Sequence, residues 1–250
     1  MKLLLKIVGI VLGVLLMVVV AGGGFMYSQM PKPTEKRIQV TPDVVGVLQK
    51  FAYVWIVRTP HGVTLIDTGP DAKPTAVLDE LAAEKLQATD VHDILLTHGH
   101  GDHWAGAKAF PNAKVYVGPG DAALVRGERH VMPAPLEKLM SPAPELIPEM
   151  TELKGDETLV LDGQTIKVVS IPGHTRGSVA YLLSDVLFTG DSLMKQKDGS
   201  LGLGPKFFSE DGDQNKQSLH KLLALDFKRT ADGHHGLTED AKAKLQAFLQ

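Results

Sequence analysis

The sequence predicts an α/β fold, and three observations support this. First, apolar β-rich runs alternate with segments of helical spacing between residues 63 and 125, a pattern typical of α/β layering. Second, the chain has 250 residues, 44% of them hydrophobic, which suits one globular domain of roughly 220 residues and a short appendage. Third, polar loops follow several expected strands. We expect the globular domain to span residues 37–250.

Residues 1–27 form the expected appendage. The run Ile7–Tyr27 carries no charged side chain and follows Lys2 and Lys6. As an α-helix it would span ~30 Å, enough to cross a bilayer core, and the lysines would keep the N-terminus in the cytoplasm. Small residues at Ala21–Gly24 leave a cleaved signal peptide as the alternative, although the apolar run is long for one. We therefore expect a single-pass membrane protein with an extracytoplasmic domain, or a secreted or periplasmic protein if the segment is cleaved.

A linker at residues 28–36 is expected to precede the domain. The β-rich runs Phe51–Arg58 and Val63–Ile66 flank the turn Pro60–Gly62, which predicts a hairpin. A second hairpin is expected around Asp162-Gly163. Further strands are expected at 91–96, 114–117, 158–161, 165–169, 178–183, 186–189 and 227–231. Helices are expected at 76–86, 104–110, 119–125, 219–225 and 241–249.

Two stretches depart from this alternation. Arg126–Glu149 contains five prolines, and we interpret it as a surface insertion over the site. Lys195–Asp213 is glycine-rich and is expected to form a mobile loop. Any selectivity for a substrate would depend on these two stretches.

The densest group of polar residues follows the expected strand at 91–96. His98, His100, Asp102 and His103 lie within six residues, separated by glycine. Burying such side chains without partners would cost several kcal/mol, so core packing does not explain them. Imidazole and carboxylate groups are common ligands of divalent metal ions. The cluster therefore predicts a metal site.

Three later loops carry the same residue types at strand ends. Gly173-His174-Thr175 follows one strand, Gly190-Asp191 another, and Gly233-His234-His235-Gly236 a third. The chain contains no cysteine, so disulfides, iron–sulfur clusters and thiolate zinc sites are excluded. A metal must therefore be held by nitrogen and oxygen. The net charge of −3 without a basic run argues against a nucleic-acid partner.

From Phe51 onward these motifs resemble the metallo-β-lactamase superfamily, whose pattern is His-x-His-x-Asp-His followed by Gly-His-Thr, Gly-Asp and Gly-His loops. The resemblance implies a four-layer αββα sandwich with two metal ions, zinc, at one edge of the sheets. It implies that one metal is held by His98, His100 and His174. It implies that the other is held by Asp102, His103 and the last histidine.

The same resemblance gives Asp191 the role of bridging both ions and places Asp67, in an Asp-Thr-Gly loop, in a supporting position. The last ligand is ambiguous, because His234 follows a glycine and His235 precedes one. We favour His235 for this position.

The function implied is that of a dinuclear zinc hydrolase acting on a small-molecule ester, lactone, thioester or amide. A hydroxide shared by the two ions would attack the substrate, with Asp102 orienting it and carrying a proton. The alternatives are a β-lactamase of the cysteine-free kind, a quorum-signal lactonase, a mononuclear iron thiol dioxygenase and a degenerate binding protein. Arg176 is a candidate contact for a substrate carboxylate, and Phe207 and Phe208 are candidates for an apolar lid.

Overall fold

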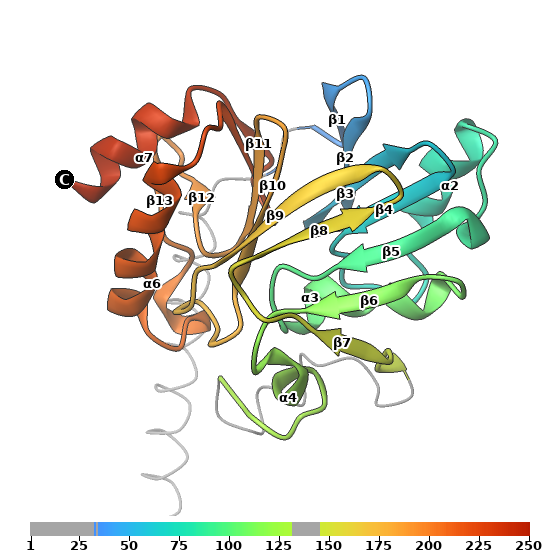
Figure 1. The fold of residues 1–250 in the computed structure, drawn as a ribbon, viewed down its shortest axis with the longest axis horizontal. Helices are drawn as coiled ribbons and strands as arrows, with labels where there is room; N and C mark the ends of the chain where they lie inside the picture. The colour runs from blue at the N-terminus through green and yellow to red at the C-terminus, as the bar shows by residue number, and fades with distance from the viewer. Residues whose placement is uncertain (1–32, 34, 132–145) are drawn as a thin grey trace, which may run out of the picture.

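Two β-sheets packed face to face, with helices on both outer faces, make up the computed structural model (Figure 1). It describes residue 33 and residues 35–131 and 146–250. The first sheet has seven strands in sequential order: β1 (Arg37–Thr41), β2 (Val44–Gln49), β3 (Ala52–Thr59), β4 (Gly62–Ile66), β5 (Val91–Leu95), β6 (Lys114–Val117) and β7 (Met150–Glu152). Neighbours pair antiparallel from β1 to β4 and parallel from β4 to β7.

The second sheet has six strands. Their spatial order is β15 (Leu237–Thr238), β14 (Arg229–Asp232), β11 (Val186–Gly190), β10 (Val179–Leu183), β9 (Gln164–Ser170) and β8 (Glu157–Leu161). Only β11 and β14 pair in parallel. A separate two-stranded ribbon is formed by β12 (Met194–Lys195) and β13 (Leu201–Gly202).

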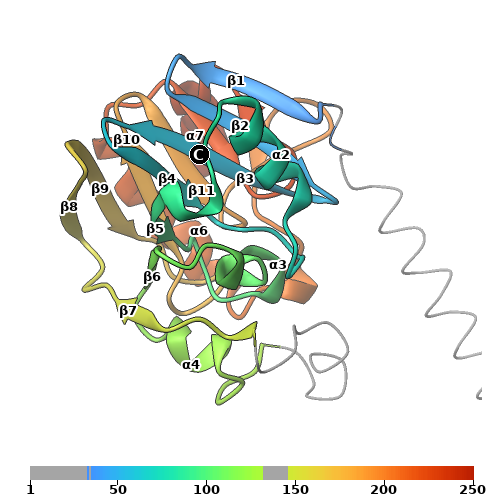
Figure 2. The ribbon, with the colours of Figure 1, turned by 90° about the vertical axis from the view of Figure 1, so that its right-hand side faces the viewer.

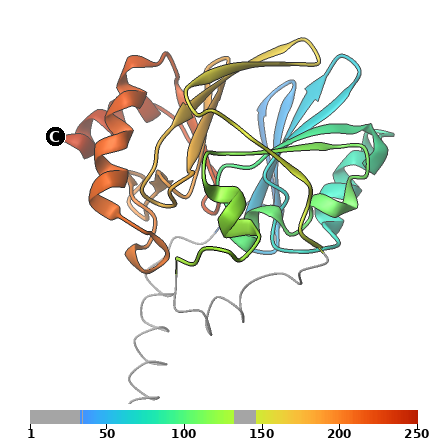
Figure 3. The ribbon, with the colours of Figure 1, turned by 60° about the horizontal axis from the view of Figure 1, so that its bottom comes forward.

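Helices flank both sheets. Beside the first sheet lie α2 (Thr75–Ala83), α3 (Gly101–Trp104) and α4 (Asp121–Val125), with the 3-10 helices η1 (Ala88–Asp90) and η2 (Ala107–Ala109). Beside the second lie α6 (Gly212–Ser218), α7 (Ala241–Leu249) and the 3-10 helices η4 (Lys206–Phe208) and η5 (Leu219–Ala224). Figure 2 shows α2 and α3 in front of the first sheet, and Figure 3 shows the layers from orange and red helices through both sheets to green helices.

Three apolar layers hold this sandwich together, and strand alternation explains them. In β3, Val54 and Ile56 face the helices of the first sheet, whereas Tyr53, Trp55 and Val57 face the second sheet. This follows from the period of two along a strand. A third apolar layer lies between the second sheet and η5 and α7. Three cores separated by two sheets confirm the expected αββα arrangement.

Most of the expected elements are present, with shifted ends. The hairpin β3–β4 is confirmed, and so is β8–β9, whose turn residues Asp162 and Gly163 both have positive φ angles. Helix α7 coincides with the predicted 241–249. Six strands, β1, β2, β7, β12, β13 and β15, were not anticipated.

Two expectations need correction. The helix expected at 104–110 begins earlier, at Gly101 in α3, so Asp102 and His103 lie on a helical turn instead of in a loop. The stretch Lys195–Asp213, expected to be one irregular loop, contains β13, η4 and the start of α6. Backbone hydrogen bonds between β12 and β13 give the first part of this stretch a regular structure.

Three further expectations fall wholly or mostly on residues that the structure does not describe. The predicted membrane segment within residues 1–27 and most of the linker at 28–36 belong to this group, and so does most of the insertion at 126–149. Within the described ranges no helix has the length and apolar character needed to cross a membrane.

Candidate metal centre

The polar side chains predicted to form a site lie together at one edge of the sandwich. They come from the loops that follow β5, β9, β11 and β14, strands that are far apart in the sequence. Three groups have potential ligand atoms within 4.8 Å of one another: His98, His100 and His174; His98, His103 and Asp191; and Asp102, His103 and His234. The sequence-based prediction that these loops converge is therefore met by the geometry.

The first group consists of three imidazoles with closely spaced nitrogens. His100 Nδ1 lies 3.0 Å from His98 Nε2 and 3.1 Å from His174 Nε2. Two nitrogens bound to one tetrahedral zinc ion at about 2.05 Å are ~3.4 Å apart. Both measured distances are thus close to the spacing of two corners of a zinc tetrahedron.

Four histidines are held through Nδ1, which leaves Nε2 facing the cluster. The Nδ1 atoms lie 3.1 Å from Thr97 Oγ1 for His98, 2.8 Å from Asp67 Oδ2 for His103, 3.1 Å from Ser209 Oγ for His174 and 2.9 Å from the Phe51 carbonyl oxygen for His234. An oxygen on Nδ1 fixes the ring orientation and is the usual arrangement around metal-binding histidines. His100 is the exception, because it turns Nδ1 to the cluster and its buried Nε2 has no hydrogen-bond partner among the described residues.

Asp191 lies between the two sets of ligands. Its Oδ2 is 3.1 Å from His234 Nε2 and 3.8 Å from His174 Nε2, and its Oδ1 is 3.5 Å from His103 Nε2. His103 Nε2 and Asp191 Oδ1 are buried without a hydrogen-bond partner in the described part of the chain. Buried polar atoms without partners are rare and costly, so their presence here fits a site built for metal ions.

Of the two adjacent histidines, His234 reaches the cluster. Its Nε2 lies 3.4 Å from Asp102 Oδ2, close to Asp191 as well. His235 belongs to none of the three groups, and its Nδ1 is buried without a partner among the residues described. The geometry therefore does not support the preference for His235 drawn from the sequence.

The histidines of the site differ in the direction of their pKa shifts. Burial, reinforced by His100, lowers the pKa of His174 to about 3, and burial likewise lowers the pKa of His98 well below its usual value. Burial opposes protonation of His103 and His234 too, but nearby carboxylates outweigh it. Asp67 raises the pKa of His103 to about 9, and Asp191 raises that of His234 to about 10. Metal binding at these two rings must displace protons.

Asp67 is a buried carboxylate that holds Thr97 and His103 in place. Its carboxylate accepts hydrogen bonds from the backbone N–H and hydroxyl of Thr97, both at 2.8 Å, and from His103 Nδ1. Asp67 is buried and has a φ of 60°, in the left-handed region that favours glycine. Such strain at a non-glycine residue is commonest at functional sites. The predicted supporting position of Asp67 agrees with these contacts.

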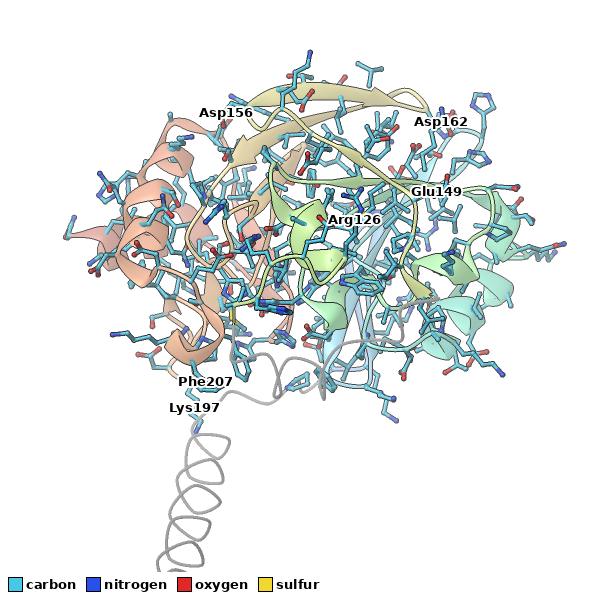
Figure 4. The ribbon with its side chains drawn as sticks, turned by 90° about the horizontal axis from the view of Figure 1, so that it is seen from below. Arg126, Glu149, Asp156, Asp162, Lys197 and Phe207 are labelled. Carbon is cyan, nitrogen blue, oxygen red and sulfur yellow. The ribbon has the colours of Figure 1, made fainter. Side chains whose placement is uncertain are left out.

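The three residues proposed for substrate contact lie at the surface. The Arg176 side chain is exposed, and its backbone N–H donates to Glu210. Phe207 is 52% exposed and projects from η4 at the periphery of the molecule (Figure 4). Phe208 is half-buried, with its ring edge-on to that of Phe207. Within the described part of the chain, these three residues make no hydrogen bond or ring contact with the metal-binding side chains.

Several residues at the site were not identified from the sequence. Thr97 and Ser209 hold ligand rings, and the Phe51 ring stacks on His234 with centroids 6.1 Å apart. Asp121 and Asp232 hold ligand loops through backbone hydrogen bonds. Both aspartates occur at a strand end or in the loop after it, the same signal that marked Asp67 and Asp191.

Comparison with known families decides the classification. The family model of the metallo-beta-lactamase superfamily matches residues 48–246. The chain belongs to this superfamily. The match covers every loop that contributes to the cluster.

Curated proteins are similar to the chain over most of its length. Hydroxyacylglutathione hydrolase of Aeromonas hydrophila is 34% identical over 177 residues, covering 69% of this chain and 56% of the relative. The enzyme of the same name from Stenotrophomonas maltophilia is 32% identical over 178 residues. The chain thus spans little more than half the length of these curated relatives. An uncharacterized protein of Mycobacterium leprae is 30% identical over 225 residues, covering 84% of this chain and 98% of that protein.

Solved structures of superfamily members share the fold. Rm3 metallo-beta-lactamase has a TM-score of 0.67 at 18% identity, covering 86% of this chain and 91% of that one. BJP-1, a subclass B3 metallo-beta-lactamase of Bradyrhizobium japonicum, has a TM-score of 0.63 at 20% identity, covering 82% and 80%. At this level of identity the likeness establishes the shared fold.

Proposed function

We propose that this protein is a metallo-hydrolase that binds two zinc ions and cleaves a small acyl thioester. The observation that carries the proposal is the arrangement of ligand atoms: four Nε2 atoms and Asp191 surround one region, and His103 Nε2 and Asp191 Oδ1 have no other partner among the described residues. The thioester substrate is suggested by the relatives named hydroxyacylglutathione hydrolase.

The first ion would be held by His98, His100 and His174. The second would be held by Asp102, His103 and His234, with Asp191 between the two. Zinc ions held there would lower the pKa of water towards 7 and polarise the substrate carbonyl. Water activated in this way would be the nucleophile, so no serine or cysteine is needed for attack, and the chain has no cysteine.

Asp102 is placed to handle the proton. Its side chain is 28% exposed, and its Oδ2 lies 3.4 Å from His234 Nε2 and 3.8 Å from His103 Nε2. A carboxylate at the open side of the site can accept a proton from the attacking water and return it to the leaving group. Because a thiolate is a good leaving group, this proton delivery matters less for a thioester than for an amide.

The experiment compares substrates on the purified full-length chain loaded with zinc. The panel contains an S-(2-hydroxyacyl)glutathione, an acyl-homoserine lactone, a cephalosporin, an aryl ester and a phosphodiester. We expect the thioester to have the highest kcat/KM. In Asp102→Ala, kcat should fall 10²–10⁴-fold while Tm stays close to that of the wild type. If Asp102→Ala turned over at nearly the wild-type rate, its assigned role would be wrong.

A β-lactamase is the second candidate, favoured by the fold similarity to subclass B3 enzymes. Hydrolysis of the cephalosporin without hydrolysis of the thioester would replace our proposal with this one. Binding of a single iron would instead indicate the thiol dioxygenase, and absence of any bound metal a degenerate binding protein.

We also propose that residues 7–27 anchor the protein in a membrane, with the catalytic domain outside the cytoplasm. The support is compositional: the run lacks charged residues and follows Lys2 and Lys6. Alkaline carbonate extraction of membranes from cells making the full chain provides the test. Retention in the membrane pellet is expected, and complete release into the supernatant would contradict anchoring.

A further inference from the structure

Asp121 is a fully buried carboxylate that takes no part in the ligand groups described above. It opens α4, directly after the turn that follows β6. Its Oδ2 accepts hydrogen bonds from the backbone N–H of Gly99 at 2.8 Å and from the Thr175 hydroxyl at 2.6 Å. Its Oδ1 accepts from the backbone N–H of Gly177 at 2.9 Å and from the Arg129 guanidinium at 2.6 Å.

These partners belong to the two loops that supply the first ligand group. Gly99 lies between His98 and His100, and Thr175 follows His174 directly. One loop extends from the first sheet and the other from the second. Asp121 therefore joins, through one side chain, the segments that hold all three imidazoles of that group.

The backbone geometry around Asp121 is adapted to this contact. A Cβ at Gly118 would overlap the carbonyl oxygen of Gly177, and a Cβ at Gly177 would lie 2.6 Å from Asp121 Cγ. The segment after β6 and the His174 loop consequently pack with their backbones in direct contact. Such close approach is possible only for glycine, and it brings Asp121 within reach of both ligand loops.

Arg129 offsets the buried charge and extends the network. Its guanidinium contacts both Asp121 and Glu210, and its side chain is only 15% exposed. Glu210 donates its backbone N–H to the carbonyl oxygen of His174 at 3.0 Å. The same network thus also holds the backbone of His174.

A second buried aspartate, Asp232, has a similar role in the loop that carries His234. Asp232 Oδ1 accepts from the backbone N–H groups of His234, His235 and Gly236, and its Oδ2 accepts from that of Lys195. These contacts hold the loop that presents His234. None of them involves the loops around His98, His100 or His174.

We propose that Asp121 is a positioning residue that sets the mutual placement of His98, His100 and His174 and thereby the zinc affinity of that group alone. The inference rests on the proposed two-zinc site. Loss of one outer contact to a metal ligand typically costs 10–100-fold in metal affinity. Asp121 contacts residues adjacent to the ligands in two ligand loops at once, so the effect should lie in this range.

The test uses His234→Ala as a background, in which only the first group can hold zinc. Zinc affinity is measured by competition with a chromogenic chelator on the full-length chain. In this background Asp121→Asn should weaken zinc binding 10–100-fold, because the amide places a donor opposite backbone N–H groups. Asp232→Asn is the matched control: it alters an equally buried carboxylate, and its effect in this background should stay within about twofold.

Thr175 provides a second, milder variant if Asp121→Asn does not fold. Thr175→Val removes one hydrogen bond to Asp121 and should weaken zinc binding, whereas Thr175→Ser keeps the hydroxyl and should restore it. Equal losses in Asp121→Asn and Asp232→Asn, or unchanged affinity in Thr175→Val, would overturn the inference. If the wild-type chain bound no zinc, the proposed function would fail instead, so the two failures are distinguishable.

Discussion

His234 and His235 are neighbours in the sequence but have different positions relative to the cluster. The turn containing them is held by Asp232, which accepts hydrogen bonds from both backbone N–H groups. Side chains of adjacent residues leave such a turn in different directions. Only His234 lies beside Asp102 and Asp191. The sequence could predict that this loop donates a ligand, but the choice between two histidines depends on turn geometry that no motif encodes.

The pair allows a direct test of the ligand assignment. His234→Ala should reduce bound zinc from two ions per chain to one, because the second group then retains too few ligands. His235→Ala should keep both ions and a kcat close to that of the wild type, because His235 belongs to none of the three ligand groups. Zinc content by elemental analysis and kcat are measured for both variants. Loss of zinc in His235→Ala alone would reverse the assignment.

The strands and their terminal loops were the most predictable elements. Runs of β-branched and aromatic residues marked β3, β4, β5 and β9–β11, and polar residues just beyond several of them marked the site. Three of the unanticipated strands lacked such signals for identifiable reasons. In β2, Gly46 interrupts the apolar run because a Cβ there would overlap the Trp55 ring. Strands β7 and β15 have three and two residues, too short for a period to appear.

The close backbone contact between the segment after β6 and the His174 loop can be tested by adding a methyl group at Gly118. Gly118→Ala should lower the free energy of unfolding by about 1–3 kcal/mol, since the methyl group overlaps the Gly177 carbonyl oxygen and forces a backbone shift. Gly212→Ala, at the start of α6, is the control. The nearest atom to its Cβ is Leu203 Cδ1 at 4.0 Å, so stability should be unchanged or slightly higher. Urea denaturation of both variants measures the difference. Equal stability of the two would show that the contact is not tight.

The whole molecule is a sandwich in which each sheet supplies part of the cluster. The loop after β5 comes from the first sheet, and those after β9, β11 and β14 from the second. Patterns in the sequence predicted which residue types lie at strand ends. They did not identify the buried carboxylates Asp121 and Asp232, although both occur at or after a strand end. Asp121 takes its role only when the loops after β5 and β9 pack around it. Long-range packing of this kind leaves no local periodicity.

The histidine pKa values predict how the stability of the metal-free protein depends on pH. His98 and His174 are neutral when folded, so their contribution is lost as the pH falls from about 6.5, the usual histidine pKa, towards the pKa of about 3 for His174. His103 and His234 have raised pKa values, about 9 and about 10. Their contribution is complete below pH 6.5 and is lost as the pH rises through those values.

The metal-free protein should therefore be most stable near pH 6.5. Thermal unfolding of the chelator-treated chain across pH 4–10 measures this, with the zinc-loaded chain as the control. Zinc keeps the ligands deprotonated, so the loaded chain should lose less stability between pH 7 and 9. Stability that kept rising from pH 6.5 to 9 in the metal-free chain would contradict the charge states assigned to His103 and His234.

The most direct test of a two-ion centre is the metal content of the purified full-length chain. Elemental analysis after equilibration with zinc and removal of the excess should give two zinc ions per chain. It should give one in His234→Ala. A wild-type value of one or none, or a preference for a single iron over zinc, would contradict the account.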